Sequence, residues 1–207
     1  MNEITAITPQ IKDKRRCNIY IDGRFCCGLT LEATVKNRLK VGQIITQEKL
    51  EEIQLESEKS VAFDKALTHI SATQKTEKQV RDFLNGKGYL PAVVEYVLEK
   101  LNSYHFLDDE AYAEHYVQSA SKRKGSWLIR MELKSKGVSD QDVSVALESL
   151  DKDCELQTAK QILEKYMRGK TADVSTLSKA FRYLMSKGFE YDIAKSALSL
   201  YGECEDE

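Results

Sequence analysis

Lys87-Gly88-Tyr89, Lys136-Gly137-Val138 and Lys187-Gly188-Phe189 recur along the chain at spacings of 49 and 51 residues. Each glycine has a leucine four residues before it, a small or branched apolar residue eight before it, and another leucine ten after it. These positions hold Leu84, Leu133 and Leu184; Val80, Ile129 and Ala180; and Leu98, Leu147 and Leu198. Residues four apart lie on one face of a helix, and glycine favours the left-handed conformation that follows a helix end. Each triplet therefore predicts a helix that ends near its glycine and a second helix that begins within three residues.

The segments upstream of the second and third pairs leave room for one more helix each, at about 108–121 and 154–167. A period near 50 residues, in which every unit exposes an apolar face to the next, is typical of solenoids. We expect a mainly α fold, an elongated solenoid of right-handed type with three tandem three-helix repeats. The repeats should occupy residues 60–107, 108–152 and 153–207, the last with an acidic tail.

The first 59 residues have a different pattern. Two β-prone runs, residues 18–21 and 24–27, flank Asp22-Gly23, a pair that favours a tight hairpin because both positions tolerate positive φ. Thr30 and Thr46 can cap a short helix to about residue 40 and a longer one from 47 toward 70. We therefore expect a small N-terminal adaptor, residues 1–59, of a β-hairpin plus helix.

The composition agrees with a helical protein. The 207 residues include 31% charged residues, two prolines and a net charge of −2, and no run approaches the roughly 18 apolar residues of a membrane span. The N-terminus lacks the basic and apolar segments of a signal peptide. We therefore expect a cytoplasmic protein that does not bind a membrane. Five cysteines without a CxxC motif predict reduced thiols.

The residue types that perform catalysis do not converge. His105, Asp108, Asp109 and His115 form the best cluster, but their spacing does not bring them to one helix face, and the two carboxylates are well placed to cap a helix. No glycine-rich phosphate-binding motif is present. The sequence predicts a protein that is not an enzyme and that binds no metal or cofactor.

Basic residues are concentrated between 120 and 136, where six of them stand against one acidic residue. Trp127, Arg130 and Lys134 fall on one stripe of a helix, next to Lys122, Arg123 and Lys124; in the first repeat the same stripe holds Lys78 and Arg81. One interpretation is a solvated face with Trp127 packed against a neighbouring helix. The other is a contact surface whose cations meet phosphates or carboxylates while the ring anchors the partner.

The same region resembles the RecX family of bacterial regulators of the RecA recombinase. The resemblance lies in Leu107-Asp108-Asp109 with Tyr112-Ala113, then Gly125, then Arg130-x-Glu132-Leu133-x-x-Lys136-Gly137-Val138. It extends to the Asp22-Gly23 hairpin and the three repeats, and so covers nearly the whole chain. Lys78 and Ser178 stand where the middle repeat has Trp127, and the third repeat is the most diverged.

This resemblance implies a non-enzymatic monomer that binds the RecA filament on single-stranded DNA. It would lie in the filament groove and inhibit ATPase, recombinase and SOS coprotease activity, in DNA repair by homologous recombination. A weak direct contact with DNA is compatible with the basic patches, whereas a net charge of −2 argues against tight non-specific binding. The alternatives are a helical module that binds single-stranded nucleic acid by itself and a generic helical scaffold.

Overall fold

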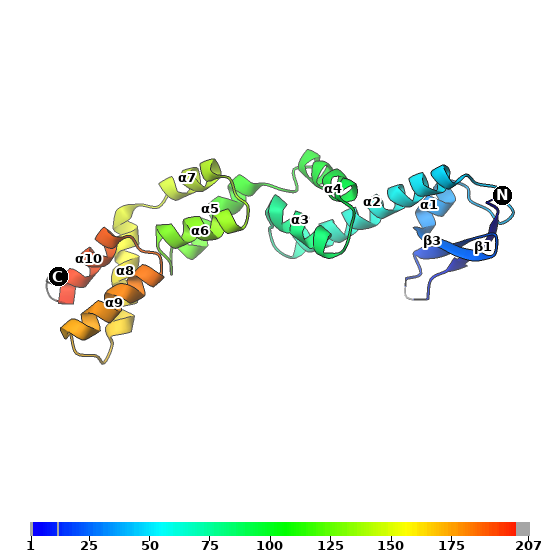
Figure 1. The fold of residues 1–207 in the computed structure, drawn as a ribbon. Coiled ribbons are helices and arrows are strands. Elements are labelled where there is room, and N and C mark those ends of the chain that lie inside the picture. The colour runs from blue at the N-terminus through cyan, green and yellow to red at the C-terminus, as the bar shows by residue number, and fades with distance from the viewer. Residues whose placement is uncertain (1, 12, 202–207) are drawn as a thin grey trace. The chain divides into compact units, whose positions relative to one another are not determined.

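The computed structural model describes residues 2–11 and 13–201, and this part of the chain is mainly helical (Figure 1). In chain order its elements are β1 (Ile4–Pro9), β2 (Arg16–Ile21), β3 (Arg24–Thr30), α1 (Leu31–Lys36), α2 (Gln47–Ala72), α3 (Glu77–Gly86), α4 (Pro91–Ser103), α5 (Asp109–Ala120), α6 (Ser126–Ser135), α7 (Asp140–Glu148), α8 (Lys152–Met167), α9 (Val174–Ser186), α10 (Tyr191–Leu198) and a 3₁₀ turn (Ser199–Tyr201). They form two compact units, residues 1–74 with 80–106 and residues 75–79 with 107–207. The acidic residues of the tail, from 203 onward, lie outside the described residues.

The N-terminal sheet is antiparallel, with the order β1-β2-β3. The predicted hairpin is confirmed: β2 and β3 are joined at Asp22 and Gly23, whose φ angles are 47° and 80°. The first strand, β1, was not expected from the sequence. It alternates apolar and polar residues over only a few positions, and Ile4 is its one fully buried side chain. Pairing with β2 therefore stabilises a strand whose own pattern is weak.

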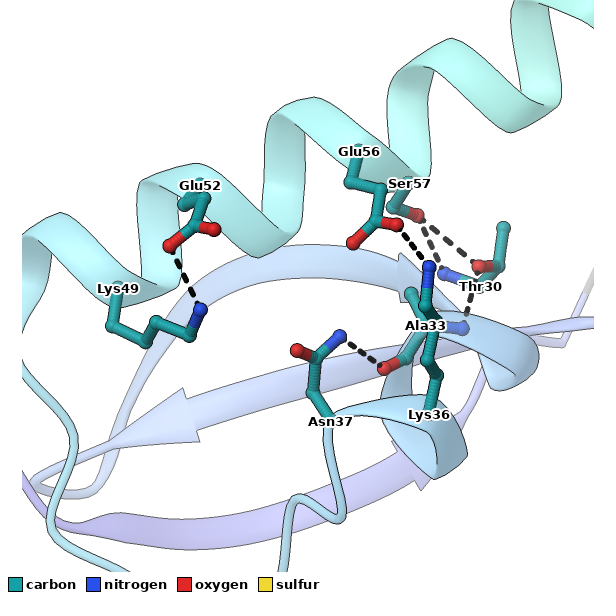
Figure 2. A network of polar contacts seen from close by, with 8 residues as sticks. All are labelled: Thr30, Ala33, Lys36, Asn37, Lys49, Glu52, Glu56 and Ser57. Atoms are coloured by element: carbon teal, nitrogen blue, oxygen red, sulfur yellow. Dashed lines mark hydrogen bonds and ion pairs between the residues drawn. The ribbon is translucent and has the colours of Figure 1, made fainter.

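Both predicted threonine caps are confirmed. The Thr30 hydroxyl accepts a hydrogen bond from the Ala33 N–H, and the Thr46 hydroxyl accepts one from the Lys49 N–H. Figure 2 shows how α1 is held against α2: the Thr30 N–H donates to the Ser57 hydroxyl at 2.9 Å, and Lys36 forms an ion pair with Glu56. These contacts tie the sheet region to the long helix.

Helix α2 is continuous, so the expected boundary between residues 59 and 60 lies inside it. Its first half buries Leu50 and Ile53 in the core of the sheet, and its second half buries Ala62 and Ala66. The helix packs against both β3 and α4. The sheet and the first repeat thus share one helix and one compact unit.

The three Lys-Gly turns follow the predicted pattern. Gly88, Gly137 and Gly188 have φ angles of 81°, 90° and 85°, and each is followed three residues later by a helix. In each turn the residue after the glycine donates its N–H to the leucine carbonyl, as in Val138 to Leu133 at 3.2 Å. This is the hydrogen-bond pattern of a Schellman motif. The leucine therefore stabilises the repeat in two ways. Its side chain packs in the core, and its carbonyl accepts the hydrogen bond that closes the turn.

The turns of the second and third repeats also receive the start of a preceding helix. The Lys187 carbonyl accepts the Gly125 N–H at 3.0 Å, and the Gly188 carbonyl accepts the Trp127 N–H at 3.2 Å. Glu155, which is buried, accepts the Ser126 N–H at 2.7 Å. The N–H groups at the start of α6, which have no partner within their own helix, are thus bound by the next repeat.

The start of α3 is held in the same manner. The Thr76 hydroxyl donates to the Lys136 carbonyl at 2.6 Å, and the Asp109 carboxylate accepts the Glu77 N–H at 3.0 Å. Burial raises the pKa of Asp109, and the hydrogen bond from Glu77 opposes that rise. Within this unit the start of α3 is therefore held by polar, directional contacts, since it meets the end of α6 and a carboxylate.

Candidate functional site

The basic stripe lies on α6, as the periodicity predicts. Ile129 and Leu133 are fully buried in the core of the second repeat, with α5 and α7 packed around them. Trp127 is 55% exposed on a different face, and Met131, one turn further on, is 47% exposed. Trp127 is therefore not a core residue, and the ring is available at the surface of the described chain.

Arg130 and Lys134, on the stripe with Trp127, are both held by α7. The Arg130 guanidinium lies 3.4 Å from the Ser144 hydroxyl, a long hydrogen bond to a neutral group. The Lys134 ammonium pairs with the Asp140 carboxylate at 2.6 Å, and both of these side chains are largely exposed. Exposed ion pairs of this kind contribute about 1 kcal/mol or less to stability. The stripe thus presents two cations that are loosely held beside an exposed aromatic ring.

Lys124 has a different environment from the other basic residues. Its ammonium contacts both carboxylate oxygens of Glu132, at 2.5 and 2.7 Å, and the Tyr116 hydroxyl donates to the same carboxylate at 2.6 Å. Burial by itself would raise the pKa of Glu132, but the hydrogen bonds from Lys124 and Tyr116 outweigh it and hold that pKa below its usual value. Burial, together with the bond to Glu132, raises the pKa of Tyr116. Lys124 therefore stabilises the repeat through Glu132.

We expect Lys124→Ala to lower the free energy of unfolding by about 1–2 kcal/mol, because it removes a cation from a half-buried carboxylate that keeps its charge. Lys122→Ala, in the same turn but at an exposed position, should change it by no more than about 0.5 kcal/mol. Urea unfolding at neutral pH compares the two. Equal effects would show that the Lys124–Glu132 pair does not stabilise the repeat.

The remaining candidates divide into exposed and engaged side chains. Lys122 and Arg123 are exposed in the turn before α6. Arg81 forms an ion pair with Glu95 on α4. Lys78 packs against Gly137, where an added Cβ would lie 2.4 Å from the Lys78 Cβ. The first-repeat pair is thus more strongly involved in packing than the second-repeat stripe.

The cluster of His105, Asp108, Asp109 and His115 is dispersed in the structure. The Asp108 carboxylate caps α5 by accepting the Ala111 N–H at 2.8 Å, which confirms the cap predicted there. His105 lies in a loop with a φ of 54°, and His115 is exposed on α5. Among the described residues, no group of three or more His, Cys, Asp or Glu side chains is placed to hold a metal ion.

Two further observations concern the cysteines and the helices. Cys17, Cys26, Cys27 and Cys154 are free thiols, and burial raises the pKa of Cys27 to about 12. Over residues 2–11 and 13–201, no helix has the length and apolar character needed to cross a bilayer.

One recurrent feature was missed in the sequence. The lysine of each triplet places its ammonium over an aromatic ring: Lys87 over Phe83 at 5.5 Å, Lys136 over Tyr116 at 5.5 Å, and Lys187 over Tyr183 at 5.3 Å. Such cation–π contacts contribute about 0.5–1 kcal/mol at exposed sites. An aromatic residue five positions before the glycine signals the contact in the first and third repeats. In the second repeat Glu132 takes that position and the ring comes from α5, so sequence spacing alone would not reveal it.

Four family models match the chain. They describe the N-terminal domain of the regulatory protein RecX, at residues 2–46, and the first, second and third three-helix domains of RecX, at residues 62–101, 108–147 and 153–198. The matches cover the sheet with α1 and all three repeats, and together they span most of the chain.

Curated relatives and solved structures agree with these models. The chain is 32% identical to the regulatory protein RecX of Clostridium tetani over 96% of this chain and 94% of that protein, and 34% identical to that of Clostridium botulinum (strain Eklund 17B / Type B) over 96% and 95%. A crystal structure of a regulatory protein RecX superposes with a TM-score of 0.69 at 25% identity, covering 96% of this chain and all of that one. RecX from Lactobacillus salivarius gives a TM-score of 0.63 at 25% identity over 70% of this chain and 96% of that one. With three-helix repeats, an N-terminal sheet and near full-length similarity, the chain belongs to the RecX family of regulatory proteins.

Proposed function

We propose that this chain binds the RecA filament on single-stranded DNA, in the filament groove, and inhibits its ATPase, recombinase and coprotease activities. Its role would thus be regulatory and not enzymatic, in the cytoplasm, in homologous recombination and the SOS response. Membership of the RecX family supports the choice of partner. The observation that carries the proposal is the exposed Trp127 beside Arg130 and Lys134 on α6.

The chemistry of this stripe suits a protein interface. Binding energy at interfaces is concentrated in a few residues, and Trp and Arg are enriched among them. A guanidinium group can bind a carboxylate in two parallel hydrogen bonds and can also stack on a ring. Trp127 with Arg130 therefore provides an apolar anchor and a charged contact on one rigid helix.

The present partners of these cations are easily exchanged. In the described part of the chain Arg130 makes one long hydrogen bond, to Ser144, and the Lys134–Asp140 pair is exposed. Releasing them costs about 1 kcal/mol or less each. A partner that surrounds the stripe and excludes water can offset this cost, since a desolvated charge pair contributes more than an exposed one.

Inhibition would follow from differential binding between filament states. A chain that contacts neighbouring RecA protomers and prefers one arrangement shifts the population toward it. Turnover of ATP and strand exchange require the filament to rearrange, so both would slow. The size of the effect is limited by the difference in affinity between the two states.

A second function, binding to nucleic acid without RecA, is supported by the exposed Lys122 and Arg123 and by the basic stripe on α6. The net charge of −2 argues against it as the main activity, because non-specific DNA binding depends on phosphate neutralisation. A weak direct DNA contact within the filament is compatible with both observations.

The proposal is tested by titrating the chain into RecA that hydrolyses ATP on single-stranded DNA. We expect the ATPase rate to fall with added chain and to saturate. A rate that stays constant at concentrations well above that of RecA would contradict the proposed inhibition.

A further inference from the structure

The Lys-Gly turns of the second and third repeats act as receptors for helix starts. In the third repeat, the turn carbonyls of Lys187 and Gly188 accept N–H groups from the start of α6. In the second repeat, the Lys136 carbonyl accepts the hydroxyl of Thr76, the residue before α3. The same structural element therefore accepts hydrogen bonds from a helix start at two places in one chain, through N–H groups in one case and a hydroxyl in the other.

Glycine is required in both turns for a reason beyond its backbone conformation. A Cβ on Gly188 would lie 2.2 Å from the Leu128 Cβ, and a Cβ on Gly137 would lie 2.4 Å from the Lys78 Cβ. Distances below 3.0 Å force one of the two groups to move. The docked helix start thus occupies the space that a side chain at the glycine would fill.

The turn of the first repeat has the same conformation but lacks this contact. Gly88 has a φ of 81°, and a Cβ built there meets no atom within 4 Å. Tyr89 closes the turn on the Leu84 carbonyl, as in the other two repeats. The Lys87-Gly88 turn of the first repeat therefore has the conformation of the other two turns, but no helix start of the described chain packs on it.

A pocket adjoins this turn within the same compact unit. It has a volume of about 800 Å³, and Lys87 of the turn and Phe83 of α3 form part of its lining. The long helix α2 contributes Asp64 and Thr68, and the sheet region contributes Arg16. In the second repeat a carboxylate, that of Asp109, binds an N–H of the docked helix start; Asp64 supplies a carboxylate in the first-repeat pocket.

We propose that the Lys87-Gly88 turn and its pocket bind the first turn of a helix from the protein partner. This inference rests on the proposed function, in which that partner is a protomer of the filament. The start of the incoming helix would donate hydrogen bonds to the turn carbonyl and to Asp64. The start of α6 does this through N–H groups, which bond the carbonyls of its turn and Glu155. The start of α3 does it through the Thr76 hydroxyl, which bonds the turn carbonyl, and the Glu77 N–H, which bonds Asp109. The two occupied turns of this chain define the chemistry of the ligand. It is a helix N-terminus whose first residues can pass close to a glycine.

A second copy of the chain is a poorer occupant. The helix of a second copy that could occupy the turn is α9, because α3 and α6 already contact the Lys-Gly turns of their own chain. Helix α9 begins 14 residues before its glycine, whereas α3 and α6 begin 11 residues before theirs. Because of this extra turn, the N–H groups at the corresponding positions already have partners within the helix. The Leu177 N–H, for example, donates to the Asp173 carbonyl at 2.9 Å. The start of α9 therefore lacks the position, relative to its glycine, at which α3 and α6 meet a Lys-Gly turn.

The test uses two matched substitutions in the full-length chain. Gly88→Asn adds a side chain at the receptor turn, and asparagine tolerates positive φ. Gly169→Asn is the control, because Gly169 has a φ of 75° and also has no atom within 4 Å of an added Cβ. Thr68→Trp, at an exposed position of α2 in the pocket, blocks the same place without altering the turn.

We measure affinity for RecA filaments by cosedimentation, helical content by circular dichroism and mass by light scattering. We expect Gly88→Asn and Thr68→Trp to bind at least about tenfold more weakly than the parent, while Gly169→Asn binds like the parent and all three variants keep the parental helical content. Parental binding by both Gly88→Asn and Thr68→Trp would overturn the inference and leave the proposed function intact. Self-association of the parent that Gly88→Asn abolishes would also overturn it, in favour of a second copy. If the parent itself does not sediment with filaments, the proposed function fails instead.

Discussion

Gly188→Ala should lower the free energy of unfolding by about 3 kcal/mol or more. Two costs combine, because an L residue is strained at the φ of 85° and its Cβ would overlap Leu128 at the start of α6. Backbone strain of this kind costs about 1–3 kcal/mol, and overpacking a close contact costs a similar amount. Urea unfolding followed by circular dichroism measures the loss.

Gly88→Ala is the matched control for this substitution. The φ of Gly88 is 81°, but no atom lies within 4 Å of the added Cβ, so only the backbone cost of about 1–3 kcal/mol should remain. The difference between the two variants isolates the contact between repeats. If both variants lose the same stability, the turn of the third repeat does not depend on close packing with α6.

Arg130→Ala combined with Lys134→Ala should weaken inhibition of RecA by at least about tenfold. A tenfold loss corresponds to about 1.4 kcal/mol, less than the roughly 2 kcal/mol that one charged contact in a desolvated interface can contribute. The fold should be spared, because Ile129 and Leu133 carry the core of α6, whereas Arg130 makes a long hydrogen bond to Ser144 and Lys134 an exposed ion pair with Asp140. Titration of the ATPase and a thermal melt of the same preparation give the two readings.

A control pair with the same loss of charge separates a local effect from a general one. Lys14→Ala with Arg24→Ala removes two exposed cations of the sheet region and should inhibit like the parent. Lys78→Ala with Arg81→Ala should weaken inhibition less than the α6 pair, because that stripe has no aromatic anchor and its side chains contact Gly137 and Glu95. Parental inhibition by the Arg130/Lys134 variant would show that the stripe is only a solvated face.

Much of the fold follows from local signals in the sequence. The leucine four residues before each glycine, the glycine itself and the helix start three residues later belong to one short turn motif, so their spacing is sufficient to predict it. The hairpin at Asp22-Gly23 and the caps at Thr30 and Thr46 are local in the same sense. Such features depend on residues within one or two turns, and the structure confirms them.

Features that depend on distant residues were not predictable. Strand β1 forms because β2 offers it a partner, and Asp109 binds the start of α3, 32 residues earlier. Lys124 appeared equivalent to its neighbours Lys122 and Arg123 until the structure placed Glu132 and Tyr116 beside it. The sequence thus predicts which residues form the basic stretch, but the structure is needed to separate Trp127, Arg130 and Lys134 from a lysine that serves the fold.

Cosedimentation with RecA filaments and with bare single-stranded DNA, at matched salt concentrations up to and above the physiological value, tests directly whether the chain binds the filament. We expect the chain to sediment with the filaments and to remain largely in the supernatant with bare DNA. The contacts on the filament would be to protein, so this binding should depend less steeply on salt than binding through phosphates does. Equal or stronger sedimentation with bare DNA, lost as salt rises, would contradict the proposed function and identify a nucleic-acid-binding module instead.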